Sequence, residues 1–405
     1  MASMASPNPP PRALEGLRVL DLATFIAAPF CAGLLAELGA DVIKVEQPEG
    51  GDSLRELGEK LHGRALFWAL EGRGKRSVTC NLRVPRGQAL ALELIQRSDI
   101  VVENFRPGTL ERWNLGYERM RDVNPGVILV RVSAYGQTGP YAERPGFGRI
   151  AQAFGGLTYL AGFPDRPPVN PGTATLADYS AGLFGAVAAL AAKQYRDRTG
   201  QGQEIDISLF ESIFRLVDIV PLAYDALGIV RERNGSRAHA APHDHYPTAD
   251  GKWIAIACTN DRIFRRLAGA MGEPAWGTDP DFDIMEKRAA RRAVVDARVG
   301  GWTGRRSLAE LRELLDAAEV PNSPIYSIAD IFEDPQYAAR GTLTAVDDPI
   351  LGHVRMQAPV PRLSETPARV PRPAPEVGEH NAEIYGELLG LDADVLEGLR
   401  AEGVI

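Results

Sequence analysis

Short runs of β-branched and apolar residues alternate with longer stretches of helical periodicity through the first half of the chain. Each apolar run is nearly continuous, which is typical of strands that are buried on both faces of a sheet. We predict strands at Arg18–Leu22, Asp41–Val45, Ile100–Glu103, Val127–Val132 and Glu204–Ser208. Helices are predicted at Pro29–Leu38, at Arg86–Arg97, in the segment that ends at Lys193, and from Leu209 onward. This alternation predicts a large, doubly wound, Rossmann-like α/β domain with a parallel sheet.

The pattern changes near residue 226, where a turn, one short strand and several helices follow one another. The strand is predicted at 252–257, and the helices at 262–271, 287–299 and 307–318. We therefore expect a smaller α+β domain over residues 226–330, beside a large domain over residues 14–225.

The last part of the chain is expected to return to the large domain. Six prolines between residues 357 and 380 predict an extended, semi-rigid strap within a linker at 331–380. The strap leads to two predicted helices, at 381–389 and 392–402. Residues 345–405 are thus predicted to complete the large domain.

Composition limits the possible partners. The net charge of -8 argues against nucleic acid and anionic membrane surfaces, because both are bound through clustered Lys and Arg. Residues 1–13 are rich in proline and lack the apolar core of a signal peptide, so we expect a disordered tail and a cytoplasmic protein. Three widely spaced cysteines, Cys31, Cys80 and Cys258, predict buried reduced thiols and no metal site.

Asp178 is the most informative single residue, because it lies where a loop is expected to end and a small-residue helix to begin. Aspartate is a preferred helix N-cap, so a purely structural role is one interpretation. A carboxylate at this place, beside the glycines Gly172, Gly182 and Gly185 that permit close packing, is also suited to chemistry. The residue alone does not decide between these interpretations.

Other segments of the chain place Asp178 in a wider pattern. With the stretch Pro171–Gly182, they resemble family III coenzyme A-transferases, in the same order and over nearly the whole chain. These segments are Leu14–Leu22, Leu38–Glu46, Gly74–Ser77, Glu103–Gly108, Tyr135–Pro140, Thr199–Gln203, Ala249–Gly251 and Gly378–His380. The resemblance implies that Asp178 is the nucleophile and that two subunits wind through one another in an interlocked dimer.

The reaction implied by the resemblance is the transfer of coenzyme A from an acyl-CoA to a carboxylic acid. A carboxylate nucleophile can conserve the energy of the thioester, first in a mixed anhydride and then in an aspartyl-CoA thioester. The chain looks most like the succinyl-CoA-dependent group that acts on the dicarboxylates malate, citramalate or benzylsuccinate. One alternative is a non-catalytic subunit of a heteromeric CoA-transferase.

The turn after the first predicted strand excludes a nicotinamide dehydrogenase. It reads Ala23–Pro29 and lacks the G-x-G-x-x-G fingerprint of that class. Coenzyme A carries phosphates and needs cations, and Arg binds phosphate through two parallel hydrogen bonds. The resemblance implies a coenzyme A site at Lys75, Arg76, Asn104, Phe105, Arg112 and Ala28. Gln47 stands where several relatives have an arginine, so we expect that phosphate contact to be weaker or to have moved.

The acid substrate is expected to meet cationic side chains. Our candidates are the histidines His243 and His245 and Arg149, which lies in the segment Phe147–Phe154 that resembles the family stretch entering the active site. Two histidines at i and i+2 without further ligands do not indicate a metal site. A second alternative is a 2-methylacyl-CoA racemase, whose catalytic histidine lies in a Gly-His-Asp segment, but the counterpart here is Gly146–Gly148 and contains none.

Overall fold

The computed structural model describes residues 11–405, and most of the predicted tail at residues 1–13 lies outside them. The described chain divides into two compact units. The large unit comprises the residues up to Leu160, Val169–Arg231 and Ala339–Ile405. The small unit comprises Ala161–Pro168 and Glu232–Ala338.

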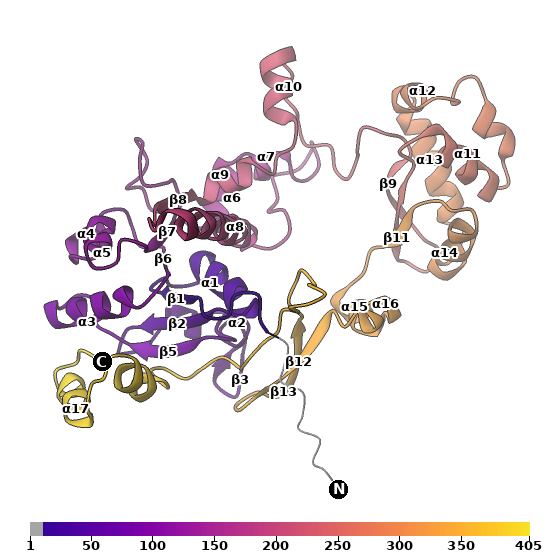
Figure 1. Cartoon of the computed structure of the whole chain (residues 1–405). Helices are drawn as coiled ribbons and strands as arrows, with labels where there is room; N and C mark the ends of the chain where they lie inside the picture. Colours follow the sequence, from indigo (N-terminus) through magenta and orange to yellow (C-terminus); the bar gives the residue numbers. More distant parts are fainter. Residues whose placement is uncertain (1–10) are drawn as a thin grey trace, which may run out of the picture. The chain divides into compact units, whose positions relative to one another are not determined.

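A six-stranded, all-parallel sheet forms the centre of the large unit (Figure 1). The strand order is β5-β2-β1-β6-β7-β8. The chain starts at the inner strand β1, continues through β2 to the edge strand β5, and then returns to β6, from which it continues through β7 to β8. The strands are β1 (Arg18–Asp21), β2 (Asp41–Glu46), β5 (Arg76–Thr79), β6 (Ile100–Glu103), β7 (Ile128–Ser133) and β8 (Glu204–Ser208). The predicted α/β class with a parallel sheet is confirmed, whereas the edge strand β5 was not predicted.

Adjacent residues of each inner strand point into two different cores, as the pleat of a strand requires. On one face, Val19 and Val42 pack with α1 (Ala27–Glu37) and α8 (Leu176–Thr199). On the other face, Leu20 and Ile43 join a second core. That core includes residues of α3 (Pro85–Gln96), α5 (Tyr117–Val123), the π-helix η3 (Ala382–Leu388) and α17 (Ala393–Ala401).

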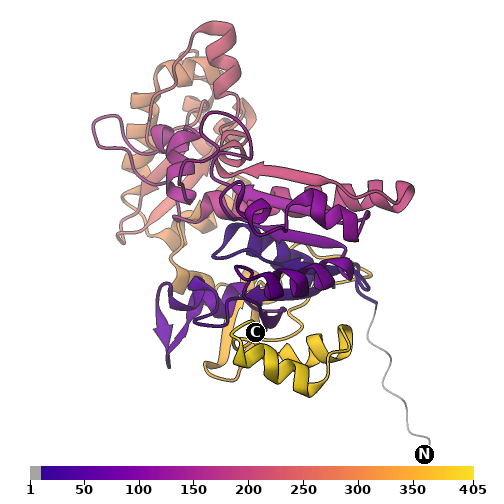
Figure 2. The ribbon, with the colours of Figure 1, turned by 90° about the vertical axis from the view of Figure 1, so that its left-hand side faces the viewer.

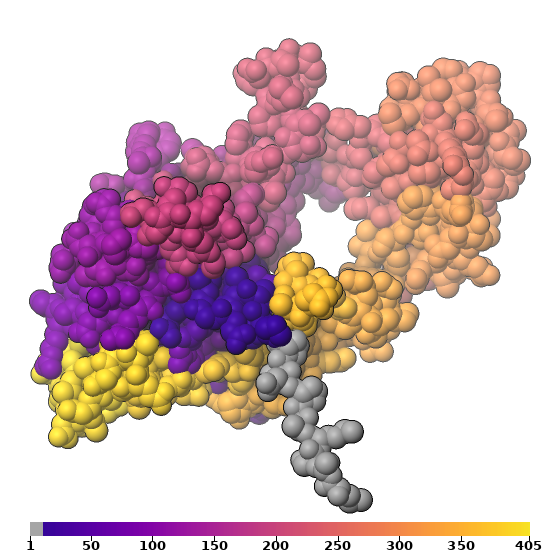
Figure 3. All heavy atoms as spheres, viewed as in Figure 1, coloured from indigo at the N-terminus to yellow at the C-terminus, as the bar shows by residue number. Residues whose placement is uncertain are grey.

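The C-terminal segment returns to the large unit and covers the second face of its sheet. Figures 1 and 2 show the two C-terminal helices, in yellow, beside the purple elements of the first hundred residues. Figure 3 shows the same residues spread over one side of the unit. Tyr385 is fully buried and its hydroxyl donates to Thr79 O at 2.7 Å, so the segment is bound to β5 directly.

Short elements connect the main ones in the large unit. They are η1 (Ser53–Glu56), β3 (Lys60–Leu61), β4 (Arg64–Ala65), α2 (Leu66–Glu71), α4 (Thr109–Arg112), α6 (Gly148–Phe154), α7 (Leu157–Leu160), α9 (Leu209–Phe214) and α10 (Val220–Leu227). A hairpin of β12 (Leu343–Asp348) and β13 (Gly352–Gln357) lies within the segment predicted as linker.

The small unit contains an antiparallel sheet and a set of helices. The sheet order is β11 (Asn322–Pro324), β10 (Trp253–Ala257) and β9 (His243–Pro247). The helices are α11 (Asp261–Ala270), η2 (Pro274–Thr278), α12 (Met285–Ala290), α13 (Arg292–Thr303), α14 (Leu308–Ala317), α15 (Ile328–Glu333) and α16 (Pro335–Ala339). The helix predicted at 287–299 is wrong in its extent, because a break at Arg291 (φ -108°, ψ 25°) separates α12 from α13.

No helix of residues 11–405 is long and apolar enough to cross a membrane. The three cysteines are free and buried, as predicted.

Candidate active site

Asp178 is the third residue of α8, because the helix begins three residues earlier than an N-cap at Asp178 would require. The N-cap is Thr175, and no side chain caps the helix start. The interpretation of Asp178 as an N-cap is therefore wrong. Its carboxylate is available for another purpose.

Two glycines bring the first turns of α8 against the start of α1. A Cβ atom at Gly182 would lie 2.7 Å from Ala27 O, and one at Gly185 would lie 3.2 Å from the Sγ atom of Cys31. These contacts leave no room for larger residues. Gly172, in contrast, has a φ of +67° and open space around it, so it serves a turn and not close packing.

The carboxylate of Asp178 lies against the backbone of α6. A Cβ atom at Gly148 would be 2.3 Å from Asp178 Oδ2 and 2.8 Å from Ala174 O. The fully buried Gln152 of the same helix donates from Nε2 to Thr173 O and Ala174 O, both at 3.2 Å. Helix α6 thus fixes the segment that leads into α8 and supports the carboxylate from one side.

Burial raises the pKa of Asp178 to about 6, and a hydrogen bond from its own backbone amide opposes the rise. The carboxylate is therefore less well solvated than an ordinary surface aspartate. It is still ionised above pH 6, which a nucleophilic carboxylate requires.

Asp178 opens into a pocket of about 260 Å³. The wall is formed by the β1–α1 loop, the segment after β6 and the segment before α6. The lining residues used below are Thr24, Phe25, Ile26, Ala27, Asn104, Phe105, Arg106, Arg144 and Phe147. Arg106 and Arg144 are exposed, and neither has an ion-pair partner among residues 11–405. The guanidinium of Arg144 lies over the Tyr141 ring at 3.7 Å.

A second pocket, of about 220 Å³, lies at the carboxyl ends of β1, β2 and β5. Its lining includes Gln47, the segment Cys80–Arg83, and Trp113. Thr24 and Phe105 line both pockets, so the two adjoin. Ligands of open parallel sheets bind at this edge. The two pockets together can hold one elongated molecule that ends at Asp178.

The structure brings only some of the predicted coenzyme residues to these pockets. Asn104 and Phe105 line the pocket of Asp178. Arg112 is exposed at the end of α4 and donates to Thr109 Oγ1 at 2.9 Å, next in sequence to the pocket residue Trp113. Ala28 is completely buried, and its neighbour Ala27 lines the pocket instead.

Lys75 and Arg76 have protein partners away from both pockets. Lys75 is 1% exposed, and its Nζ atom lies 2.9 Å from Asp21 Oδ2 and 2.7 Å from Pro29 O. Arg76 begins β5 and pairs with Asp41 and Glu383, at the amino edge of the sheet. A phosphate contact would require both side chains to leave these carboxylates, so their coenzyme role stays a prediction without geometric support.

The predicted acid-binding residues also lie in different places. Arg149 is exposed on α6, directly after Gly148, but it does not line the pocket of Asp178. His243 and His245 lie on β9 of the small unit, where the sequence predicted a loop. They line a pocket of about 310 Å³ within that unit, together with Ser236, Asp244 and residues of β10 and β11. In the described residues, no group of three or more metal-ligating side chains is found.

Two cations at the pockets, Arg83 and Arg144, were not among the site residues predicted from the sequence. Arg83 lines the second pocket, is exposed, and has no side-chain partner among the described residues. Recognition of β5 as a strand would have identified it, because Arg83 lies just beyond the carboxyl end of that strand. Arg144 lies five residues before Arg149, and nothing in the local sequence distinguishes the two.

Comparison with known proteins agrees with this arrangement. The sequence model of CoA-transferase family III matches residues 14–381. The succinyl-CoA–L-malate CoA-transferase beta subunit of Chloroflexus aurantiacus is 48% identical over 97% of this chain and 98% of its own length. The succinyl-CoA–D-citramalate CoA-transferase of the same organism is 46% identical over 98% and 99%.

A solved structure has the same fold. The crystal structure of a CAIB/BAIF family protein from Brucella suis superposes with a TM-score of 0.81 and 36% identity, and it covers 93% of this chain and 99% of its own. The resemblance inferred from the sequence segments is thereby confirmed. The chain belongs to CoA-transferase family III, and it is a CoA-transferase.

Proposed function

We propose that the protein transfers coenzyme A from succinyl-CoA to a dicarboxylic acid, with Asp178 as the nucleophile. The observation that carries the proposal is the placement of this carboxylate, with its raised pKa, in a pocket that adjoins the ligand edge of the sheet. The relatives named after succinyl-CoA and malate or citramalate support the substrate class.

In the proposed reaction, an oxygen of ionised Asp178 attacks the thioester carbonyl of succinyl-CoA. The C–S bond breaks, the CoA thiolate leaves, and a mixed anhydride of succinate and Asp178 forms. The thiolate then attacks the aspartyl carbonyl, which releases succinate and leaves an aspartyl-CoA thioester. The acceptor carboxylate repeats the two steps in the opposite direction and restores Asp178. Each step exchanges one acyl bond for another, so neither ATP nor a metal ion is consumed.

The adjoining pockets support a path for coenzyme A. We place its nucleotide at the carboxyl ends of β2 and β5, and its thioester at Asp178, with Thr24 and Phe105 between them. The rings of Phe105 and Trp113 pack edge to face with centroids 5.0 Å apart and offer an apolar surface for the pantetheine or adenine. Arg112 is next in sequence to Trp113, and Arg83 lines the second pocket, so we assign the nucleotide phosphates to these two cations.

We expect Arg83→Ala and Arg112→Ala to raise KM for succinyl-CoA by roughly 10- to 100-fold with little change in kcat, since a charge-assisted hydrogen bond contributes about 1.5–3 kcal/mol. Steady-state kinetics with dephospho-CoA esters would identify the residue that binds the 3'-phosphate. The variant that lacks this residue should have the same KM for the CoA ester and for the dephospho-CoA ester. Arg86→Ala is the matched control, because Arg86 is an exposed arginine paired with Glu402. If all three variants had the same KM, the nucleotide would lie elsewhere.

The second carboxylate of the acceptor needs a cation near Asp178. Arg144 lines the pocket and has no ion-pair partner in the part of the chain that the structure describes, whereas Arg149 was the candidate from the sequence. Arginine holds a carboxylate through two parallel hydrogen bonds and so distinguishes a dicarboxylate from a monocarboxylate.

A panel of acids tests the proposed function and this assignment together. With succinyl-CoA as donor, we expect transfer to malate or citramalate and much weaker transfer to monocarboxylates of equal length. Arg144→Met should lower kcat/KM for the dicarboxylate at least about 10-fold more than for the monocarboxylate. A selective loss in Arg149→Met instead would restore the original candidate. Absence of transfer to every dicarboxylate would contradict the proposed function.

The racemase alternative has no structural support. The residues that line the pocket of Asp178 include Gly146 and Phe147 at the position of that family's catalytic histidine, and no histidine lies among them. An acid and a base are both needed to move the proton of an α-carbon. We therefore retain the transferase reaction.

We further propose that the chain assembles as a dimer, either with itself or with a homologous chain. In α10, Leu222, Tyr224 and Leu227 are 66%, 62% and 72% exposed, and Figure 1 shows this helix apart from the other elements of the large unit. Exposed apolar faces of this kind mark protein interfaces. The L-malate relative is named a beta subunit, which supports the heteromeric alternative. Molar mass and activity of the chain expressed alone would distinguish the two.

A further inference from the structure

The β1–α1 loop contributes to both pockets, since Thr24 lines each of them, and it forms part of the wall around Asp178. Thr24, Phe25, Ile26 and Ala27 all line the pocket of Asp178. In residues 11–405, the amides of Ile26 and Ala27 have no hydrogen-bond acceptor. Unpaired amides at the start of a helix stabilise negative charge that develops beside them. The conformation of this short loop therefore matters for chemistry at Asp178.

Two side chains hold consecutive peptide groups of the loop. Asn104 Oδ1 accepts from Thr24 N–H at 2.8 Å, while its Nδ2 donates to Thr24 O at 2.7 Å. Asp52 Oδ1 accepts from Phe25 N–H at 3.1 Å. Asn104 directly follows β6, and Asp52 is the N-cap of η1 in the segment after β2; these two strands lie on either side of β1. The loop is thus held by residues that follow each of the two strands adjacent to β1.

The residue held by Asp52 has an unfavourable backbone conformation. Phe25 has a φ of +61°, in the left-handed region that non-glycine residues rarely adopt. Such a conformation is energetically unfavourable and persists where surrounding contacts enforce it. The hydrogen bond to Asp52 is such a contact, and the Phe25 ring also packs edge to face on Phe147, with centroids 6.1 Å apart.

Asp52 is itself held rigidly in the interior. It is 2% exposed, its Oδ1 also accepts from Leu54 N–H at 2.9 Å, and its Oδ2 lies 2.9 Å from the Nζ atom of Lys44. Lys44 is 1% exposed and also contacts Ala23 O of the loop. Despite its burial, Lys44 and the backbone hydrogen bonds hold the pKa of Asp52 below its ordinary value, so the residue is a carboxylate.

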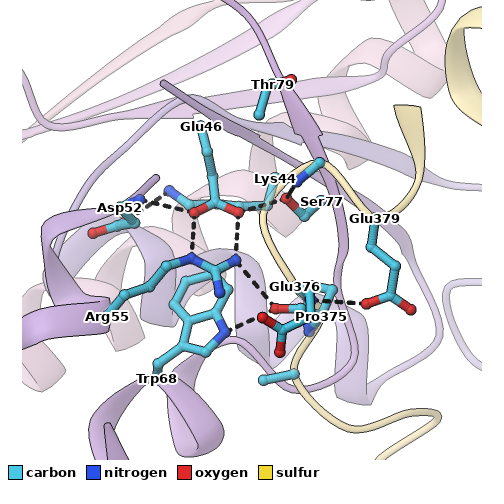
Figure 4. Close-up of polar contacts among 12 residues, drawn as sticks. Lys44, Glu46, Asp52, Arg55, Trp68, Ser77, Thr79, Pro375, Glu376 and Glu379 are labelled. Carbon is cyan, nitrogen blue, oxygen red and sulfur yellow. Dashed lines mark hydrogen bonds and ion pairs between the residues drawn. The ribbon is translucent and has the colours of Figure 1, made fainter. Parts of the chain in front are cut away.

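Figure 4 shows what fixes the other side of Asp52. Its backbone N–H donates to Glu46 Oε2 at 2.8 Å, and Glu46 binds Arg55 through both oxygens. Arg55 reaches Pro375 O of the C-terminal segment at 3.1 Å. Trp68 Nε1 donates to the same carbonyl at 2.9 Å. A continuous set of buried contacts thus runs from the C-terminal segment to the loop beside Asp178.

We propose that Asp52 is a positioning residue for the transfer reaction: through the N–H of Phe25 it fixes the β1–α1 loop so that the amides of Ile26 and Ala27 face the reacting carbonyl at Asp178. This inference rests on the proposed function. Asp52 also lines the second pocket, so an effect on KM has to be separated from the effect on the loop. It acts on kcat through the loop.

A matched pair of double variants isolates the hydrogen bond from the ion pair. Lys44→Met/Asp52→Asn and Lys44→Met/Asp52→Leu both remove the two buried charges, and both replacements for Asp52 have nearly its size. Only the asparagine retains an oxygen that accepts from Phe25 N–H. We expect the asparagine variant to keep kcat within about 5-fold of the wild type, and the leucine variant to lose about 30- to 100-fold, because displacement of a catalytic group by about 1 Å costs that much.

Three further measurements separate positioning from loss of structure. KM for succinyl-CoA should be the same in both variants, since any effect of Lys44 on the second pocket is common to them. Amide hydrogen exchange of a peptide covering residues 23–28 should be protected in the asparagine variant and fast in the leucine variant. Trp68→Phe, which removes the distant bond to Pro375 O, should lower the melting temperature without lowering kcat.

Equal kcat values and equal exchange in the two double variants would overturn the inference, as would a difference confined to KM or to the folded fraction. Exchange does not depend on the reaction. If the wild type proves inactive with succinyl-CoA and every acid, the proposed function fails. In that case, amide hydrogen exchange alone tests whether Asp52 holds the loop through the N–H of Phe25.

Discussion

Asp178→Asn abolishes coenzyme A transfer, with kcat lowered by on the order of 10³-fold or more, because the amide cannot form the anhydride or the aspartyl thioester. Asp178→Ala behaves in the same way. The measurement is release of the acceptor's CoA thioester from succinyl-CoA by liquid chromatography. Incubation of the wild type with succinyl-CoA and hydroxylamine should convert Asp178 to a hydroxamate, and peptide mass analysis would locate it.

The raised pKa of Asp178 adds a dependence on pH. Only the ionised form attacks, so kcat/KM should fall about tenfold per pH unit below pH 6. The change of stability with pH has the opposite sign to that caused by an ion-paired carboxylate. Because the folded protein holds this proton more tightly than the unfolded chain does, stability from this group decreases as pH rises from about 4 to about 6. Above pH 6, burial of the charge opposes folding.

Asp178→Asn should therefore be at least as stable as the wild type at pH 7.5, while it is inactive. Thermal unfolding followed by circular dichroism measures this. An inactive and strongly destabilised variant would indicate a structural role for Asp178. Residual transfer above about 1% would show that another group is the nucleophile.

The fold was predictable where the sequence carries long apolar strands. The strands at Ile100–Glu103 and Glu204–Ser208 were predicted with the bounds that the structure has. The residues that flank each of them in the sequence clearly mark where the strand begins and ends. β5 was missed because Arg76 and Ser77 interrupt its apolar character. Their partners come from distant segments: Arg76 pairs with Glu383, and the N–H of Ser77 donates to His380. Local periodicity contains no information about such partners.

The coenzyme residues were predicted less well than the strands. Lys75 and Arg76 were carried over from the family resemblance, although they lie at and before the amino end of β5. Arg83, at the opposite end, was passed over. Asp178 was identified only from the order of many segments, since its local sequence also fits an N-cap. The role of Asp52 depends on a contact with Phe25, 27 positions earlier, and no sequence pattern marks it.

Gly148→Ala should strongly reduce the rate of transfer, because it acts directly on the position of Asp178. The added Cβ atom would lie 2.3 Å from Asp178 Oδ2 and 2.8 Å from Ala174 O, so the carboxylate or the start of α8 must move. Carbon and oxygen need more than 3 Å, and a displacement of about 1 Å at a reacting group costs roughly 100-fold in rate. We expect kcat to fall by about that factor, while KM for succinyl-CoA, which depends mainly on the second pocket, changes little.

Gly398→Ala provides the control for this substitution. Gly398 lies in helix α17 of the same unit, and a Cβ atom there would meet nothing within 4 Å. Both replacements remove a helical glycine, which stabilises a helix by about 0.5–1 kcal/mol, so only the collision with Asp178 distinguishes them. Gly398→Ala should raise the melting temperature and leave kcat unchanged. If Gly148→Ala kept full kcat, the carboxylate would have room to adjust, and the close approach of α6 would not be what positions it. A loss in Gly148→Ala together with a shifted pH profile would show that the displaced carboxylate is the one that reacts.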